Sequence, residues 1–142
     1  MYSEYQKKDQ EHFSAWAPHF DSGLDGIFFR ASYRAVLKAF LPQSHARVLE
    51  VACGTGGFIK ALLKKEPMLS ITGIDYTPAM LAEAETKFKN DPRGHLVQGS
   101  AEDIPLREQF DSVYCLDAFH HFQNEDKALE EMRRAVKQSG VI

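Results

Sequence analysis

The residues best suited to chemistry follow a short apolar run near the middle of the chain. Glycines stand at positions 54, 56 and 57, shortly after the run Val48–Val51. Between a strand and a helix, glycines let the backbone approach a ligand closely, although so short a pattern also fits a plain turn. Asp75 closes the next apolar run, 21 positions after Gly54. An acidic side chain there accepts hydrogen bonds from ribose hydroxyls, so the two features indicate a nucleoside site.

Two familiar phosphate-binding loops do not fit this segment. The dinucleotide fingerprint G-x-G-x-x-G needs a small third residue, and Ile59 stands there. A P-loop needs Lys followed by Ser or Thr, whereas Phe58 and Ile59 follow Gly57. A nicotinamide oxidoreductase is therefore disfavoured, and it ranks third after the two interpretations described at the end of this subsection.

A second group of polar residues follows a later apolar run. His120 and His121, with Asp117 close by, stand at the end of the predicted fourth strand, where a general base would be needed if the acceptor carries a proton. The same residues also fit a capping or packing role. The two cysteines show no CxxC spacing, so neither a metal site nor a disulfide framework is expected.

These residues need a scaffold in which strands and helices alternate. Periodicity predicts strands over 47–51, 69–74, 95–98 and 110–115, and helices over 5–20, 26–41, from 58 up to Pro67, from Pro78 to 89, and over 124–138. This order predicts an α/β, Rossmann-like, doubly wound and mostly parallel sheet with helices on both faces. Ligands of such sheets bind beyond the carboxyl ends of the strands.

The C-terminal end of the pattern breaks off. Ser139-Gly140 predicts a helix-ending turn, and Val141-Ile142 resemble the start of a fifth strand. The sheet is therefore expected to be incomplete after the fourth strand, whose exposed edge invites pairing. Either the chain is a fragment of a longer protein, the reading we favour, or it completes itself as a homodimer through that edge.

Four motifs in order resemble the class I S-adenosylmethionine-dependent methyltransferases, most closely the small-molecule branch often labelled type 11. They are VLEVACGTG (48–56), GIDYTPAML (73–81), GSAEDIPL (99–106) and FDSVYCLDAFHHF (110–122). The resemblance implies S-adenosylmethionine as cofactor. The cofactor-binding residues that it implies are Glu50, Ala52, Cys53, Gly54, Gly56, Asp75, Tyr76, Met80, Ser100, Ala101, Glu102 and Cys115.

The resemblance also implies individual roles. The Gly54 loop and Glu50 would serve the methionine part, Asp75 the ribose hydroxyls, and the Tyr76 ring one face of the adenine. Ser100 stands where the family often has Asp or Asn, so Glu102 or Asp103 would have to compensate at the adenine edge.

The resemblance implies one domain over 1–142, with the N-terminal helices of residues 1–42 as a cap or lid and residues 46–142 as a cofactor-binding core. Aromatic residues of the chain fit either a stripe packed on the sheet or the wall of an acceptor pocket. They are Tyr5, Phe13, Trp16, Phe20, Phe119 and Phe122.

The composition indicates which classes of partner to expect. The 142 residues are 44% hydrophobic and 26% charged, with a net charge of −3, which fits a globular protein without a long basic block. A nucleic-acid partner is therefore disfavoured, and no apolar stretch suggests a signal peptide or a membrane span. We expect a cytoplasmic methyltransferase for a small-molecule acceptor. A catalytically silent cofactor-binding or assembly module is the alternative.

Overall fold

A computed structural model describes residues 2–142. Helices and strands alternate after an N-terminal helical segment, and two short 3-10 helices are labelled η. The elements are α1 (Glu4–Trp16), η1 (Ala17–His19), α2 (Gly23–Ala39), β1 (Arg47–Val51), α3 (Gly57–Lys65), β2 (Ser70–Asp75), α4 (Pro78–Phe88), β3 (Gly94–Gln98), β4 (Phe110–Tyr114), η2 (Phe119–His121), α5 (Glu125–Ala135) and β5 (Val136–Val141).

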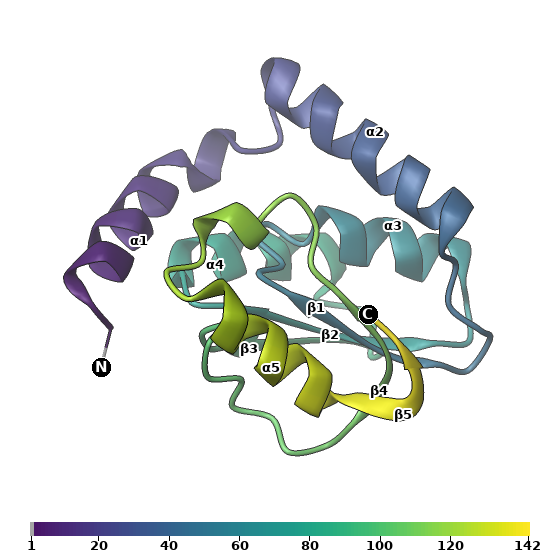
Figure 1. Ribbon diagram of the computed structural model, residues 1–142. Helices are drawn as coiled ribbons and strands as arrows, with labels where there is room; N and C mark the ends of the chain where they lie inside the picture. The colour runs from purple at the N-terminus through teal and green to yellow at the C-terminus, as the bar shows by residue number, and fades with distance from the viewer. Residues whose placement is uncertain (1) are drawn as a thin grey trace.

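The strands form one sheet in the order β3-β2-β1-β4-β5, and all four neighbouring pairs are parallel (Figure 1). Val48 of the central strand β1 lies opposite Ile71 of β2 and Ser112 of β4. This arrangement confirms the predicted doubly wound α/β class. The strand order reverses between β1 and β4, so the carboxyl ends of these strands mark the switch point at which such sheets bind ligands.

The prediction for the last residues is wrong. The helix was expected to reach Gln138 and the sheet to end at β4, but α5 ends at Ala135 and β5 pairs with β4, Phe110 lying opposite Val136. The polar run 137–139 carries no strand periodicity, so pairing with β4 decides its conformation rather than local preference. The β4 edge is covered, and a homodimer through an exposed edge would have to use another strand. That dimer stays a prediction.

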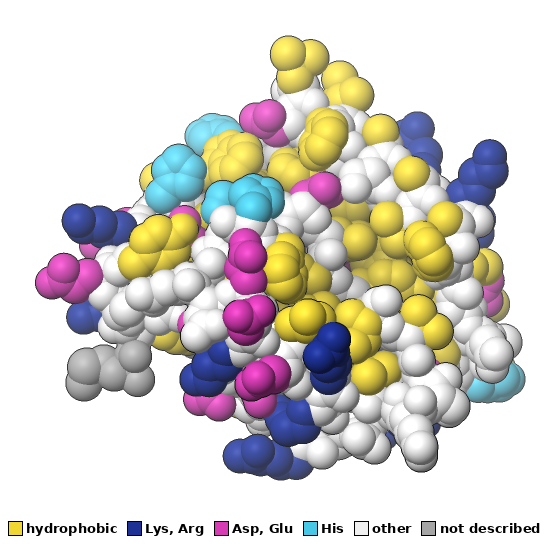
Figure 2. Space-filling view, viewed as in Figure 1, with side chains coloured by type: hydrophobic (Ala, Val, Ile, Leu, Met, Phe, Trp, Pro, Cys, Tyr) yellow, Lys and Arg dark blue, Asp and Glu magenta, His cyan; other side chains and the backbone are white. Residues whose placement is uncertain are grey.

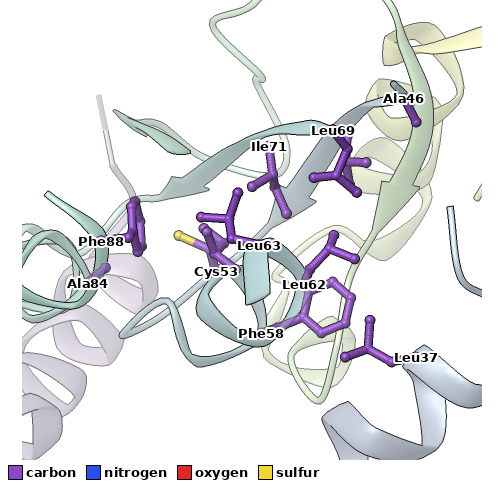
Figure 3. Packing of buried hydrophobic residues seen from close by; sticks show 12 residues of the cluster. Leu37, Ala46, Cys53, Phe58, Leu62, Leu63, Leu69, Ile71, Ala84 and Phe88 are labelled. Carbon is purple, nitrogen blue, oxygen red and sulfur yellow. The ribbon is translucent and has the colours of Figure 1, made fainter. Parts of the chain in front are cut away.

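Two apolar clusters cover the two faces of the sheet. One joins α3 and α4 to β1 and β2, and Figure 3 shows its side chains pointing toward one another between helix and strands. The other joins α5 to the opposite face through Ala128, Met132 and Ala135. Fully burying a large apolar side chain contributes roughly 1.5–3 kcal/mol, so these clusters fix the strand ends that carry the site.

The first two helices and η1 form a layer of their own, the N-terminal helical layer (residues 4–39), which arches over the sheet in Figure 1. The helix predicted over 5–20 divides into α1 and η1 because Pro18 lacks the N–H that an α-helix needs. Ser3 and Gln6 cap α1 reciprocally, and α1 contains no fully buried residue. Helix α2 begins at Gly23, three residues before the predicted start.

Within residues 2–142, no helix combines the length and the apolar character that crossing a membrane requires. The cytoplasmic location expected from the composition stays a prediction.

Candidate active site

A cavity of about 400 Å³ lies at the carboxyl ends of β1, β2 and β4, and residues of α1 and α2 close its other side. Most residues singled out in the sequence line it. These are Glu50, Ala52, Cys53, Gly54, Asp75, Tyr76, Met80, Ser100, Ala101, Glu102, Asp117, His120 and His121. The fold therefore brings together four segments that lie far apart in the sequence.

Two of the predicted residues, Gly56 and Cys115, do not line the cavity. Gly56 precedes α3 with a φ of +72°, and a Cβ there would lie 2.9 Å from the Cβ of Ala84. Its absent side chain thus serves the packing of α3 against α4. Cys115 packs against the apolar cluster under α5, and burial raises the pKa of its thiol to about 12.

The loop after β1 turns sharply toward the cavity. Ala52 and Gly54 both have positive φ values, +57° and +52°. A left-handed conformation is unfavourable for alanine, and such strain is found mainly where function requires an unusual backbone path. A Cβ at Gly54 would meet nothing closer than a Phe20 ring atom at 4.0 Å. The loop therefore presents bare backbone to the cavity.

Asp75 ties the ends of β1 and β2 together. Its carboxylate accepts hydrogen bonds from the backbone N–H groups of Gly54, at 2.9 Å, and Thr77, at 2.8 Å. Burial raises the pKa of Asp75, while these two N–H groups act in the opposite direction. A carboxylate oxygen accepts more than one hydrogen bond, so both oxygens can still receive ligand hydroxyls.

Glu50 is the most unusual polar group of the cavity wall. It is only 3% exposed, and its Oε2 atom has no hydrogen-bond partner among the described residues. Burial raises the pKa of Glu50 well above its usual value, and the nearby Asp75 raises it further. A buried, unpartnered carboxyl group costs stability, which a ligand with a hydrogen-bond donor or a positive charge would offset.

The segment after β3 is held by its own hydrogen bonds. The Ser100 hydroxyl accepts from the Glu102 N–H at 3.1 Å. The Glu102 carboxylate accepts from the N–H groups of Gln123, at 2.9 Å, and Asn124, at 3.2 Å. One oxygen of Glu102 thus fixes the start of α5, and Asp103, the other candidate to compensate for Ser100, does not line the cavity.

The histidine pair lies where β4 ends, in η2. The rings of His120 and His121 are 4.1 Å apart, centroid to centroid, and His121 Nδ1 is 3.9 Å from Asp9 Oδ1 of α1. Burial and the charge of His120 lower the pKa of His121. Asp117 adopts a left-handed φ of +53° at the cavity wall. The three predicted residues thus share one side of the cavity.

Aromatic rings of α1, α2 and neighbouring segments line the cavity together with the polar groups. Phe13, Trp16 and Phe20, for which two roles were considered, line the cavity, and Phe20 stacks on Phe29 with centroids 4.5 Å apart. Phe122 also lines the wall, whereas Tyr5 and Phe119 do not. On the face seen in Figure 2, histidine and hydrophobic side chains gather side by side. The cavity wall therefore combines polar groups with aromatic rings.

A family model described as a methyltransferase domain matches residues 48–140. The chain belongs to the methyltransferase domain family. This match confirms the resemblance to the class I S-adenosylmethionine-dependent methyltransferases and sets the nicotinamide reading aside. In place of the small residue that a dinucleotide loop needs, the buried Ile59 packs against Gly73, where a Cβ would lie 2.5 Å from its Cδ1.

Individual relatives agree with the family. The chain is 33% identical to a demethylmenaquinone methyltransferase of Deinococcus radiodurans, over 92% of this chain and 56% of the relative. It is 28% identical to a ubiquinone/menaquinone biosynthesis C-methyltransferase of Campylobacter jejuni, over 96% of this chain and 62% of the relative. The chain thus spans about half the length of the curated relatives that it matches.

Solved structures give the same fold. YcgJ of Bacillus subtilis is 29% identical, with a TM-score of 0.69 over 78% of this chain and 48% of that one. The complex of DhpI with SAH is 23% identical, with a TM-score of 0.75 over 95% of this chain and 66% of that one. The methyltransferase domain is therefore a Rossmann-like one, as expected.

Several residues on the cavity wall were missed by the sequence reasoning. Asp9 and Gln6 of α1 and Phe28, Phe29 and Tyr33 of α2 all line it. The polar residues of α1 read as an ordinary solvated helix face, because no local pattern marks which of them a distant loop will meet. The repeated aromatic residues of α2 were the only available signal.

A partly buried network attaches the segment before α2 to the glycine loop of the methyltransferase domain. Lys87 of α4 donates to the Asp21 carboxylate at 2.5 Å and to the Thr55 carbonyl. The Thr55 hydroxyl, almost fully buried, donates to the same carboxylate at 3.0 Å. Asp21 therefore joins the N-terminal helical layer to the loop after β1.

Proposed function

We propose that this chain binds S-adenosylmethionine in the cavity and transfers its methyl group to a small apolar acceptor. The observation that carries the proposal is the unpartnered Oε2 atom of Glu50, which is buried near Asp75 in the wall of a cavity that aromatic rings also line. An ammonium group and a ribose are the parts of this cofactor that need such carboxylates.

Each wall segment has a distinct role in the proposal. Asp75 accepts hydrogen bonds from the ribose hydroxyls, and the backbone around Gly54 lies along the methionine part. Glu50 receives the amino group, directly or through water. Tyr76 offers its ring to the adenine, and Ala101 lies at the adenine edge. Gly56 and Cys115 act indirectly, through packing, because neither reaches the cavity wall.

When bound, the cofactor would supply an electrophilic methyl group: an acceptor atom bonds to the methyl carbon in line as the S–CH3 bond breaks, and S-adenosylhomocysteine leaves as a neutral thioether. The protein has to hold the acceptor atom about 3 Å from the methyl carbon and keep water out. We assign the exclusion of water to the N-terminal helical layer, as a lid whose aromatic rings line the cavity.

A general base is needed where the acceptor carries a proton that it does not lose unaided. His121 suits this role, because its lowered pKa leaves the imidazole neutral near pH 7 and able to accept a proton. His120 and Asp117 lie on the same wall and assist by orienting the acceptor.

The aromatic wall favours a flat, apolar acceptor. Rings of Phe13, Trp16, Phe20 and Phe29 offer faces and edges to another ring. The relatives from D. radiodurans and C. jejuni carry names that specify quinone methylation. We therefore propose carbon methylation of a quinol-like ring as the first acceptor to test. A catalytically silent cofactor-binding module is the second candidate, supported by Ser100, whose hydroxyl is held by the Glu102 N–H in place of a carboxylate at the adenine edge.

The deciding experiment is a calorimetric titration of the purified chain with S-adenosylmethionine and S-adenosylhomocysteine. We expect micromolar binding of both, at least about 100-fold weaker in Asp75→Ala, since that change removes a charged hydrogen-bond acceptor. Glu85→Ala, an exposed change on α4, is the matched control and should bind as the wild type does. A folded chain that binds neither compound would overturn the proposal.

Turnover separates the two candidates. Transfer of labelled methyl groups to a quinol, in a panel that includes phenols and amines, supports the enzyme. Tight binding of both compounds without transfer to any acceptor supports the silent module.

A further inference from the structure

Asp9 is the one acidic side chain of α1 among the residues that line the cavity. It is 16% exposed, although the helix around it has no fully buried residue. The Tyr76 hydroxyl donates to its Oδ2 atom, and its Oδ1 atom lies 3.9 Å from His121 Nδ1. One carboxylate thus contacts both a segment after β2 and a segment after β4.

These two segments lie on opposite sides of β1 in the sheet. Asp9 therefore spans the switch point between β1 and β4. It can contact both segments only while α1 lies over the cavity. Other contacts hold α1 in the same position over the cavity. Gln10 donates to the Tyr76 carbonyl, and the Phe13 ring meets the His121 ring edge-on, with centroids 5.0 Å apart.

We propose that Asp9 is a positioning residue, which fixes the Tyr76 ring and places a negative charge beside the His121 imidazole while α1 lies over the cavity. The hydroxyl contact holds the Tyr76 ring at the place where the proposed function puts the adenine, so this part rests on that function. The charge beside His121 acts on the protonation of the imidazole and does not depend on any ligand.

The ligand-independent part is tested by the titration of His121 in the free protein, followed by the NMR signals of its ring protons. The charged and titratable groups that face His121 are Asp9 and His12 of α1 and His120 of η2. Asp9 raises the pKa of His121 and the two histidines lower it. Asp9→Asn keeps the size of the side chain but removes its charge, so the His121 pKa should fall.

Glu11→Gln is the matched control, since Glu11 lies on the same helix but is exposed and does not line the cavity. It should leave the His121 titration unchanged. An Asp9→Asn titration that matches the wild type would overturn the contact between Asp9 and His121, whatever the protein binds.

The part that involves Tyr76 is tested by a double-mutant cycle on S-adenosylhomocysteine affinity. Asp9→Ala and Tyr76→Phe should each weaken binding about tenfold, as expected for loss of a hydrogen bond to a charged group. The double variant should be no weaker than either single one, because both changes remove the same contact. Effects that multiply would overturn the coupling.

Trp16, the only tryptophan of the chain, lies on α1 and lines the cavity, so its fluorescence reports on the position of that helix. Its fluorescence should change when the wild type binds S-adenosylhomocysteine, and Asp9→Ala should reduce the amplitude at saturation. If the wild type binds and Asp9→Ala gives the same fluorescence amplitude, the role of Asp9 is contradicted and the proposed function is not. Absence of binding in the wild type contradicts the proposed function instead.

Discussion

The sheet and the N-terminal helical layer are held in place by different forces. The sheet lies between two apolar clusters whose members are almost completely buried, among them Val48, Leu49 and Ile71. Helix α2 of the layer contributes Leu37 to one of these clusters. The rest of the layer contacts the domain through aromatic rings and through partly buried polar bridges from Asp9, Gln10 and Asp21. Extensive apolar burial resists local opening, whereas a few polar and ring contacts open more readily. The half of the site on the strand ends is therefore rigid, and the half on the helices is the part that can move.

The largest difference in stability between the sheet and the N-terminal helical layer should come from deleting one aromatic ring in each. Phe58→Ala removes a ring that is 1% exposed between α3 and the sheet, so unfolding in guanidinium chloride should require about 3–5 kcal/mol less. Phe13→Ala removes a half-buried ring from α1 and should cost at most about 1 kcal/mol. Equal losses would mean that the layer is as firmly held as the sheet.

A second contrast concerns two glycines of one loop. Gly56→Ala forces a left-handed alanine against Ala84 and should lower the free energy of unfolding by about 2–3 kcal/mol, with little change in S-adenosylhomocysteine affinity. Gly54→Ala meets open space, so its stability cost should stay near 1 kcal/mol. Its methyl group points toward the cavity, however, and should weaken binding about tenfold. Denaturation and calorimetry on both variants check this division between packing and binding.

Glu50 should lower the free energy of unfolding, because its carboxyl group is buried in the strand-end half of the site without a hydrogen-bond partner for Oε2 among the described residues. Its pKa is raised in the folded chain, so the folded state binds more protons than the unfolded state above the usual glutamate pKa, and stability falls as pH rises through the folded pKa. Glu50→Gln removes this loss and should add about 1–2 kcal/mol to the free energy of unfolding at pH 7. Thermal unfolding at pH 5, 7 and 8 measures the difference, which should shrink toward low pH.

Binding should respond to Glu50 in the opposite direction. A cationic amino group favours the ionised carboxylate, so cofactor binding should release a proton, and affinity should rise with pH toward the raised pKa of Glu50. Glu50→Gln should bind more weakly and lose this pH dependence. A variant that is both less stable and equally tight in binding would contradict the assignment of Glu50.

The sequence predicted the rigid half better than the mobile one. Four strands, the glycine loop and Asp75 carry local signals, since apolar runs, glycines and an acidic strand end each have a physical meaning by themselves. The strand β5 was missed because its polar residues pair only by virtue of β4 beside them. Asp9 was missed for a similar reason, because its role depends on Tyr76 and His121, which lie far away in the chain.

The smallest expected effect concerns the joint between the two halves. Lys87 holds Asp21 and the Thr55 carbonyl together, but Asp21 is 40% exposed, so Lys87→Met should change the free energy of unfolding by less than about 1 kcal/mol. Hydrogen exchange should nevertheless accelerate over residues 20–26 and 54–57, because the contact limits local opening rather than global unfolding. Lys89→Met, an exposed change just beyond the end of α4, should leave both regions as they are. Faster exchange along β1 and β2 as well would show that the layer and the sheet open together, and the division between a rigid and a mobile half would then fail.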